Sequence, residues 1–175
     1  MEQDGATRRD FLFYATTATG VVGTGLALWP FISFMNPAAD TRALASTEID
    51  LAPVALGQRI TVSWQGKPVF IVHRTAAQIH QAEADDTSPG LLDPERDEDR
   101  VQKPEWLIVI GICTHLGCIP QGQAPGSNRG QWGGWFCPCH GSQYDISGRV
   151  RHGPAPKNLV VPKYVFRSKD TVKIG

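Results

Sequence analysis

The chain has 175 residues, a length that fits one globular domain with room for an additional element. Its 17 Lys and Arg residues balance 17 Asp and Glu residues, so no basic excess is available to neutralise phosphates, which argues against a nucleic-acid binder. The zero net charge together with a hydrophobic content of 41% argues against a disordered chain.

The first element is an uncharged N-terminal segment, because residues 11–35 contain no Asp, Glu, Lys, Arg or His. As a helix this segment would be ~37 Å long, enough to cross a hydrocarbon core of ~30 Å with some tilt. Trp29, Phe31 and Phe34 near its end are typical of an interfacial aromatic belt. A buried core helix is the alternative, but such helices are rarely this long and this free of charge. We therefore predict a transmembrane helix over residues 11–35.

Twin arginines, Arg8 and Arg9, stand directly ahead of this segment. The stretch Thr7–Leu12 resembles the twin-arginine export signal, which carries folded proteins across the bacterial inner membrane. The lysine that often follows in that motif is Phe13 here. We expect residues 1–10 to be a cytoplasmic N-terminus that carries this signal.

The segment after the helix raises the question of cleavage. Ala43-Leu44-Ala45 before Ser46 is similar to a signal-peptidase site, whereas the apolar run is longer than the 7–15 residues of a usual signal peptide. These residues alone leave cleavage and retention open. Residues 36–47 are small and polar without a strand pattern, and we predict a flexible hinge there.

The remaining residues, 48–175, are predicted to form a β domain. The chain has 18 glycines and 13 prolines, more than the combined share of roughly 12% that is average in proteins, and this enrichment favours a loop-rich β structure. Alternating residues predict a hairpin with strands at 59–64 and 68–72 around a turn at 65–67. Thr75 is placed to cap a short helix that ends near Glu83. Further strands are expected at 106–112, 134–136, 143–146, 159–161, 164–167 and 171–174.

A polar stretch at residues 84–104 interrupts this pattern, with a run of charges at 93–100. We predict a solvated loop for the charge run, since alternating charges usually mark an exposed face.

All four cysteines fall in two short boxes, Cys113-Thr114-His115-Leu116-Gly117-Cys118 and Cys137-Pro138-Cys139-His140-Gly141-Ser142. Two ordinary disulfides would leave the paired histidines unexplained. A structural zinc site needs four ligands with two to four residues between paired cysteines, a spacing that the second box does not meet. Catalytic cysteine chemistry would need one nucleophile rather than four clustered thiols.

A different count uses one Cys and one His from each box, in the patterns Cys113-x-His115 and Cys137-x-x-His140. Two cysteines and two histidines are the ligand set of a Rieske [2Fe–2S] centre, in which two histidines replace two cysteines on one iron. The boxes therefore predict one such cluster per chain. His73, His80 and His152 lack ligand spacing, and we expect structural or surface roles for them.

With these motifs the sequence resembles the Rieske iron–sulfur subunits of bacterial cytochrome bc1 complexes along nearly its whole length. The resemblance rests on the twin arginines, the apolar segment, the Ala-rich hinge, the stretch before Pro104-Glu105-Trp106, both boxes and the Gly153-Pro154-Ala155-Pro156 loop. It implies a mainly β fold: a Rieske-type antiparallel β domain with two cluster-binding loops on a single N-terminal transmembrane helix.

The resemblance also implies a role for each site residue. Cys113 and Cys137 would hold the buried iron, His115 and His140 the outer iron, and Cys118 and Cys139 would form a disulfide. The hydroxyls of Ser142 and Tyr144 would donate hydrogen bonds that raise the redox potential toward the high end of the Rieske range, roughly −150 to +300 mV. The remaining implied roles are His140 as the quinol-facing ligand, Leu116 as a docking tip, and Gly153, Pro154 and Pro156 as a bracing loop.

The implied function is electron transfer within quinol–cytochrome c reductase, an enzyme of which this chain would be one subunit, inactive alone. Quinol, cytochrome b and cytochrome c1 are the expected partners, in a dimeric complex. The anchor would be kept in the lipid of the inner membrane, with the N-terminus in the cytoplasm and the Rieske domain in the periplasm. The alternatives are a soluble periplasmic Rieske subunit, such as that of arsenite oxidase, and a structural zinc-binding membrane protein.

Overall fold

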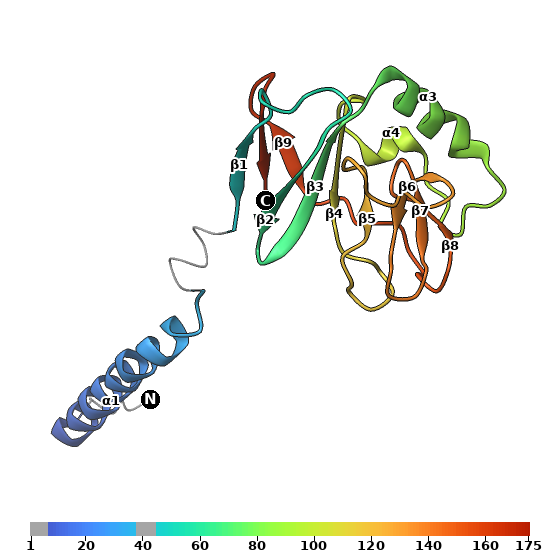
Figure 1. Ribbon diagram of the computed structural model, residues 1–175. Helices are drawn as coiled ribbons and strands as arrows, with labels where there is room; N and C mark the ends of the chain where they lie inside the picture. The colour runs from blue at the N-terminus through green and yellow to red at the C-terminus, as the bar shows by residue number, and fades with distance from the viewer. Residues whose placement is uncertain (1–6, 38–44) are drawn as a thin grey trace. The chain divides into compact units, whose positions relative to one another are not determined.

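The structure is a computed structural model that describes residues 7–37 and 45–175 (Figure 1). The chain falls into two units, residues 1–43 and residues 44–175, and each is described by itself.

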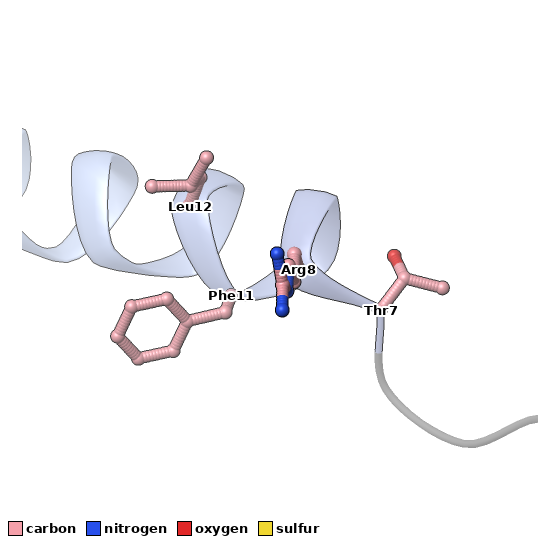
Figure 2. Close-up of a pocket in the computed structure, with 4 residues that line it drawn as sticks. All are labelled: Thr7, Arg8, Phe11 and Leu12. Atoms are coloured by element: carbon pink, nitrogen blue, oxygen red, sulfur yellow. The ribbon is translucent and has the colours of Figure 1, made fainter.

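Among the described residues of the first unit, 7–37, the structure has one helix, α1 (Arg8–Ser33), which is long and apolar enough to cross a membrane. It begins with a capping box, in which the Asp10 amide donates to the Thr7 hydroxyl at 3.2 Å and the Thr7 amide donates to the Asp10 carboxylate at 2.9 Å. The helix therefore starts three residues before the predicted 11–35 segment and includes Arg8 and Arg9. A shallow hollow at the start of α1 is lined by Thr7, Arg8, Phe11 and Leu12 (Figure 2). Because residues of a single helix line it, we assign no ligand to it.

The second unit contains three antiparallel sheets, as expected for a mainly β domain. One has the strand order β1-β10-β9, from β1 (Thr47–Asp50), β9 (Tyr164–Phe166) and β10 (Thr171–Ile174). The next has the order β2-β3-β4, from β2 (Arg59–Trp64), β3 (Lys67–His73) and β4 (Trp106–Ile110). The third has the order β5-β6-β7-β8, from β5 (Gln121–Gly122), β6 (Gly133–Phe136), β7 (Gln143–Asp145) and β8 (Val150–His152).

The helices of this unit lie between β3 and β4 in sequence: α3 (Ala76–Ala84), the 3-10 helix η1 (Asp85–Thr87) and α4 (Asp97–Arg100). Thr75 caps α3 with Gln78, which confirms the predicted helix start. The β2–β3 hairpin is also confirmed, and its turn places Gln65 and Gly66 in the left-handed region at φ 50° and 72°.

Two expectations about the strands are wrong. Residues 159–161 form no strand, because single backbone bonds to other segments hold them instead: the Leu159 amide donates to Gly148 and the Ile110 amide donates to the Val160 carbonyl. Thr47, expected in the hinge, belongs to β1. Residues 38–44, which include most of the expected hinge and part of the possible cleavage site, lie outside the described residues.

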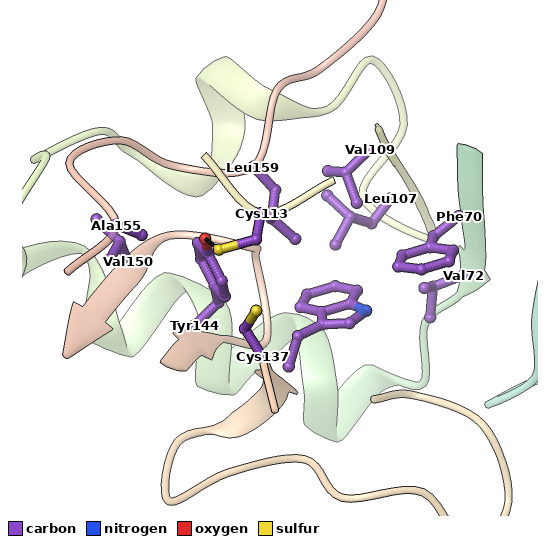
Figure 3. Packing of buried hydrophobic residues seen from close by; sticks show 11 residues of the cluster. Phe70, Val72, Leu107, Val109, Cys113, Cys137, Tyr144, Val150, Ala155 and Leu159 are labelled. Atoms are coloured by element: carbon purple, nitrogen blue, oxygen red, sulfur yellow. Dashed lines mark hydrogen bonds between the residues drawn. The ribbon is translucent and has the colours of Figure 1, made fainter. Parts of the chain in front are cut away.

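The middle sheet separates two hydrophobic cores, since successive side chains of a strand point to opposite faces. On β3, Val69 and Ile71 enter one core, whereas Phe70 and Val72 enter the other. The second of these cores continues into the β5–β8 sheet and is drawn in Figure 3; its buried members are Phe70, Val72, Leu107, Val109, Cys113, Trp135, Cys137, Tyr144, Val150, Ala155 and Leu159. Two of the four cysteines are therefore part of a packed core.

The charge run at 93–100 is only in part the solvated loop that its composition predicts. Asp97 and Arg100 are only 2% and 3% exposed, and α4 begins at Asp97. Arg74 holds Asp97 with two hydrogen bonds of 2.7 and 3.0 Å, a bidentate pair between groups 23 residues apart. Asp97 and Arg100 are buried because partners for both come from other parts of the chain, whereas Arg96, Glu98 and Asp99 are exposed as predicted. We call residues 84–104 the insertion.

Candidate metal centre

The two cysteine–histidine boxes form two loops with the same backbone turn. In the first loop the Cys113 amide donates to the Cys118 carbonyl at 2.7 Å and the Gly117 amide donates to the Cys113 carbonyl at 3.0 Å. In the second loop the Cys137 amide donates to Ser142 at 2.8 Å and the Gly141 amide donates to Cys137 at 2.9 Å. Gly117 and Gly141 have φ of 83° and 76°, a conformation that favours glycine. The glycine in each box is thus needed for the turn that aims its side chains.

A disulfide between Cys118 and Cys139 joins the two loops, which confirms that expectation. It leaves Cys113 and Cys137 as free thiols, 2% and 1% exposed. The sulfur atoms of Cys118, Cys137 and Cys139 lie within 4.8 Å of one another. Because two of these sulfurs are bonded to each other, they are not thiolate ligands, and the thiols available to a metal in these loops are those of Cys113 and Cys137.

The two histidines of the boxes lie side by side, with ring centroids 4.7 Å apart and ring planes at 88°. The Nδ1 atom of His115 is buried and has no hydrogen-bond partner among the described residues. A buried imidazole nitrogen normally has a partner, so this atom fits the role of a metal ligand. Two buried thiols and two adjacent imidazoles suit a cluster with two Cys and two His ligands.

Hydroxyl groups lie around the thiol of Cys113. Burial disfavours its thiolate, but the hydroxyl of Tyr144, which donates to the Cys113 sulfur at 3.1 Å, acts in the opposite direction, as does Ser142. The net effect lowers the pKa of Cys113 below its ordinary value. Burial instead raises the pKa of Cys137, with the neighbouring Cys113 acting in the same direction. The environment therefore distinguishes the two thiols and favours negative charge on Cys113.

The proline loop that follows β8 packs directly against the second box. A Cβ atom on Gly153 would lie 2.6 Å from the Ser142 Cα and 2.9 Å from its amide nitrogen, and φ at Gly153 is 94°. The buried Ala155 donates its amide hydrogen to the Ser142 hydroxyl at 3.1 Å. Gly153 and Ala155 of the proline loop are thus in direct contact with Ser142 of the second box.

Two features near the site were not predicted from the sequence, the contact of Thr114 with Lys157 and the exposure of Ile119. The hydroxyl of Thr114 donates to the Lys157 carbonyl at 2.6 Å, which ties the first loop to the chain beyond the proline loop. At the tip, Ile119 is 58% exposed, and Leu116 is 71% exposed as expected. An exposed Leu–Ile pair beside the disulfide is an apolar tip.

The other histidines have the ordinary environments that we expected. His73 stacks on Trp106 with centroids 4.1 Å apart, and its Nδ1 lies 2.8 Å from the Val54 carbonyl. His152 is exposed and stacks on Trp132, and His80 is exposed on α3.

Comparison with protein-family models gives the class of this domain. Residues 52–165 match the model described as "Rieske [2Fe-2S] domain", and residues 1–38 match "Ubiquitinol-cytochrome C reductase Fe-S subunit TAT signal". The chain therefore contains a Rieske domain, whose cofactor is a [2Fe–2S] cluster. The donor set described above fits that cofactor.

Curated relatives give the family within this class. The chain is 61% identical over 170 residues to the "Ubiquinol-cytochrome c reductase iron-sulfur subunit" of Rhodospirillum rubrum, covering 97% of this chain and 92% of the relative. The proteins of the same name from Blastochloris viridis and Rhodobacter capsulatus are 56% and 46% identical, with 97% and 99% of this chain and 93% and 98% of the relatives covered. A solved structure titled "Hyperthermophilic respiratory Complex III" aligns with a TM-score of 0.55 at 26% identity, covering 91% of this chain and 97% of that chain. The chain belongs to the family of ubiquinol–cytochrome c reductase iron–sulfur subunits.

Proposed function

We propose that this chain takes an electron from quinol at cytochrome b and passes it to cytochrome c1, as one subunit of an oxidoreductase that does not turn over alone. The observation that carries the proposal is the pair of disulfide-linked loops that contributes two buried thiols and two adjacent imidazoles. When bound there, a [2Fe–2S] cluster supplies one-electron chemistry at a potential raised by the neutral histidine ligands. Cys113, Cys137, His115 and His140 are the residues that we assign as its ligands.

His140 is the residue that we propose faces quinol. It is exposed, whereas its partner His115 is half-buried, so a hydroxyl group from outside can reach the His140 ring. In this role the outer nitrogen of His140 accepts the quinol proton. A midpoint potential that stays constant with pH in the alkaline range would contradict this proton transfer.

The exposed tip formed by Leu116 and Ile119 is the surface that we propose docks on cytochrome b. Apolar side chains at 71% and 58% exposure are unfavourable in water, and a partner surface would cover them. Leu116→Ala is expected to slow quinol oxidation while leaving the midpoint potential unchanged. Normal quinol oxidation in this variant would contradict the docking role.

The helix α1 is proposed as a retained anchor in the inner membrane, with residues 1–10 in the cytoplasm and the Rieske domain in the periplasm. The family match to a twin-arginine signal supports export of the folded domain, and the 26-residue length of α1 supports a membrane span. Residues 36–47 are proposed as the hinge on which the domain moves between its partners. Mass measurement of the protein extracted from membranes tests the anchor, since a chain beginning at Ser46 would contradict it.

Electron paramagnetic resonance of dithionite-reduced membranes is the direct test of the cluster assignment, because zinc would give no signal. We expect a Rieske signal that is lost in His115→Ala and kept in His80→Ala, a matched control for an exposed histidine outside the boxes. Co-purification with cytochromes b and c1 in a dimeric complex tests the partners. A protein that purifies without them and still carries the signal would favour a different oxidoreductase.

A further inference from the structure

The insertion at residues 84–104 contacts two segments next to the metal centre. Its acidic side chains bond to the turn at 145–149, which follows Tyr144, and to residues 157–158, which follow the proline loop. Neither segment holds an assigned ligand. Both, however, are in contact with groups that lie beside Cys113.

The contact with residues 157–158 is made by Asp93 through both its backbone and its side chain. The Asp93 carboxylate accepts the Asn158 amide at 3.1 Å and the Lys157 ammonium group at 3.2 Å, and its carbonyl accepts the Asn158 side chain at 3.0 Å. Asn158 is 5% exposed and also accepts the Val150 amide at 2.9 Å. The hydrogen bond from Asn158 holds the pKa of Asp93 below its usual range. Asp93 therefore clamps a segment of the main chain.

The clamped segment in turn holds the first loop of the metal centre. The carbonyl of Lys157 accepts the Thr114 hydroxyl at 2.6 Å, and Thr114 lies between the assigned ligands Cys113 and His115. One peptide unit, from the Lys157 carbonyl to the Asn158 amide, thus bonds to Thr114 on one side and to Asp93 on the other. Because a peptide unit is planar and rigid, its orientation is shared by both bonds.

The second contact reaches the metal centre from behind Tyr144. Arg149, fully buried, donates to Asp145 at 2.8 Å, to Asp86 at 2.5 Å and to the Ala82 carbonyl at 2.8 Å. Burial disfavours its cation, but the charges of Asp145 and Asp86 outweigh burial and raise the pKa of Arg149. The turn that ends the Tyr144 strand is thereby fixed to the insertion.

We propose that the insertion is a brace for the metal centre and that Asp93 is a positioning residue, which orients Thr114 through the Lys157–Asn158 peptide. This inference rests on the proposed assignment of Cys113 and His115 as ligands. Asp93 touches no ligand and acts only through the hydrogen bonds described above. Its loss should therefore loosen the first loop while leaving the rest of the domain intact.

Hydrogen exchange of the full-length protein in detergent tests this brace. In Asp93→Ala we expect faster exchange of the peptide covering residues 113–118 and unchanged exchange in the β2–β3 hairpin. Glu98→Ala is the matched control, since it removes a carboxylate of the same insertion whose ion pair with Arg96 is 64–66% exposed. Exchange that is unchanged at 113–118, or that rises equally in the hairpin, would overturn the proposal. Hydrogen exchange does not depend on the cluster. A negative result for the brace is therefore distinguishable from a failure of the proposed function, which would show as a wild-type protein without a Rieske signal.

The route through the peptide is tested by two further variants, with the midpoint potential as readout. Lys157→Met breaks the ion pair with Asp93 but keeps the Lys157 carbonyl and the Asn158 amide, so we expect a potential like that of the wild type. Thr114→Val removes the hydroxyl that donates to the Lys157 carbonyl. Asp93→Ala should therefore shift the midpoint potential less in the Thr114→Val variant than in the wild-type protein. Equal shifts in the two backgrounds, or a Lys157→Met shift as large as that of Asp93→Ala, would overturn the route.

Discussion

Replacing Tyr144 by Phe removes the hydroxyl that donates to the Cys113 sulfur at 3.1 Å and keeps the buried ring. A hydrogen bond to sulfur stabilises the more negative, reduced state more than the oxidised state. A buried hydrogen bond contributes about 0.5–1.5 kcal/mol. For a one-electron couple, 59 mV corresponds to about 1.4 kcal/mol. We therefore expect the midpoint potential of Tyr144→Phe to be ~20–60 mV lower than that of the wild type.

Redox titration followed by electron paramagnetic resonance measures this shift. Tyr164→Phe is the matched control, because Tyr164 on β9 is also buried and its hydroxyl accepts the Gln102 amide at 3.0 Å. Gln102 belongs to the insertion but takes no part in the hydrogen bonds that join Asp93, Lys157, Asn158 and Thr114. We expect Tyr164→Phe to lower the unfolding free energy by about 1 kcal/mol without changing the potential. An unchanged potential in Tyr144→Phe, or equal shifts in the two variants, would refute the assignment of the Tyr144 hydroxyl as a tuning group.

Three further predictions concern stability, and one concerns iron content. Arg149→Met leaves buried carboxylates without their partner, and chemical denaturation should show a loss of about 3–5 kcal/mol; a loss below 1 kcal/mol would contradict the buried network. Replacing Cys118 and Cys139 together by Ser opens a loop with a sequence separation of 21, and the same measurement should show a loss of about 3 kcal/mol. Gly153→Ala forces a Cβ atom against the backbone of the second box, so the purified variant should contain less than the wild-type iron, and full iron content would contradict the bracing role. The pKa of Asp93 is lower in the folded protein than in the unfolded chain, so the ionised carboxylate stabilises the fold above about pH 4. This stabilisation disappears as the pH falls through the pKa of Asp93 in the folded protein. The difference in unfolding free energy between wild type and Asp93→Ala should therefore become smaller in acid.

The sequence predicted those features that depend on residues close together in the chain. The two boxes, the turn at Gln65–Gly66 and the Thr75 cap each depend on a few adjacent residues, and all were found where expected. The continuous apolar run of β4 likewise predicts a strand, because a strand that packs on two faces is apolar on both. The disulfide was expected from the resemblance to a family, since pairing of four cysteines is open on spacing alone.

The features that sequence reasoning missed depend on partners far apart in the chain. The composition of the charge run at 93–100 predicts solvated side chains. However, the Asp97 carboxylate accepts hydrogen bonds from Arg74, 23 residues away in the chain, and from Ser147, 50 residues away. The bond between Thr114 and Lys157 spans 43 residues and joins residue types that carry no pairing signal. Short strands such as β5, with two residues, are likewise too brief to leave an alternating pattern.

The way in which the β5–β8 sheet is stabilised explains why the insertion is needed. Its strands are two to four residues long, so few ladder bonds fix the loops between them. One disulfide fixes the two box loops to each other but does not by itself fix them to the segments around them. Buried Arg149 bonds the turn after Tyr144 to Asp86 of the insertion, and Asp93 and Arg100 of the insertion bond residues 157–159, so the insertion fixes both segments in place. An electron-transfer site needs ligands that do not move between oxidation states, and here buried charge provides the rigidity that such short strands lack.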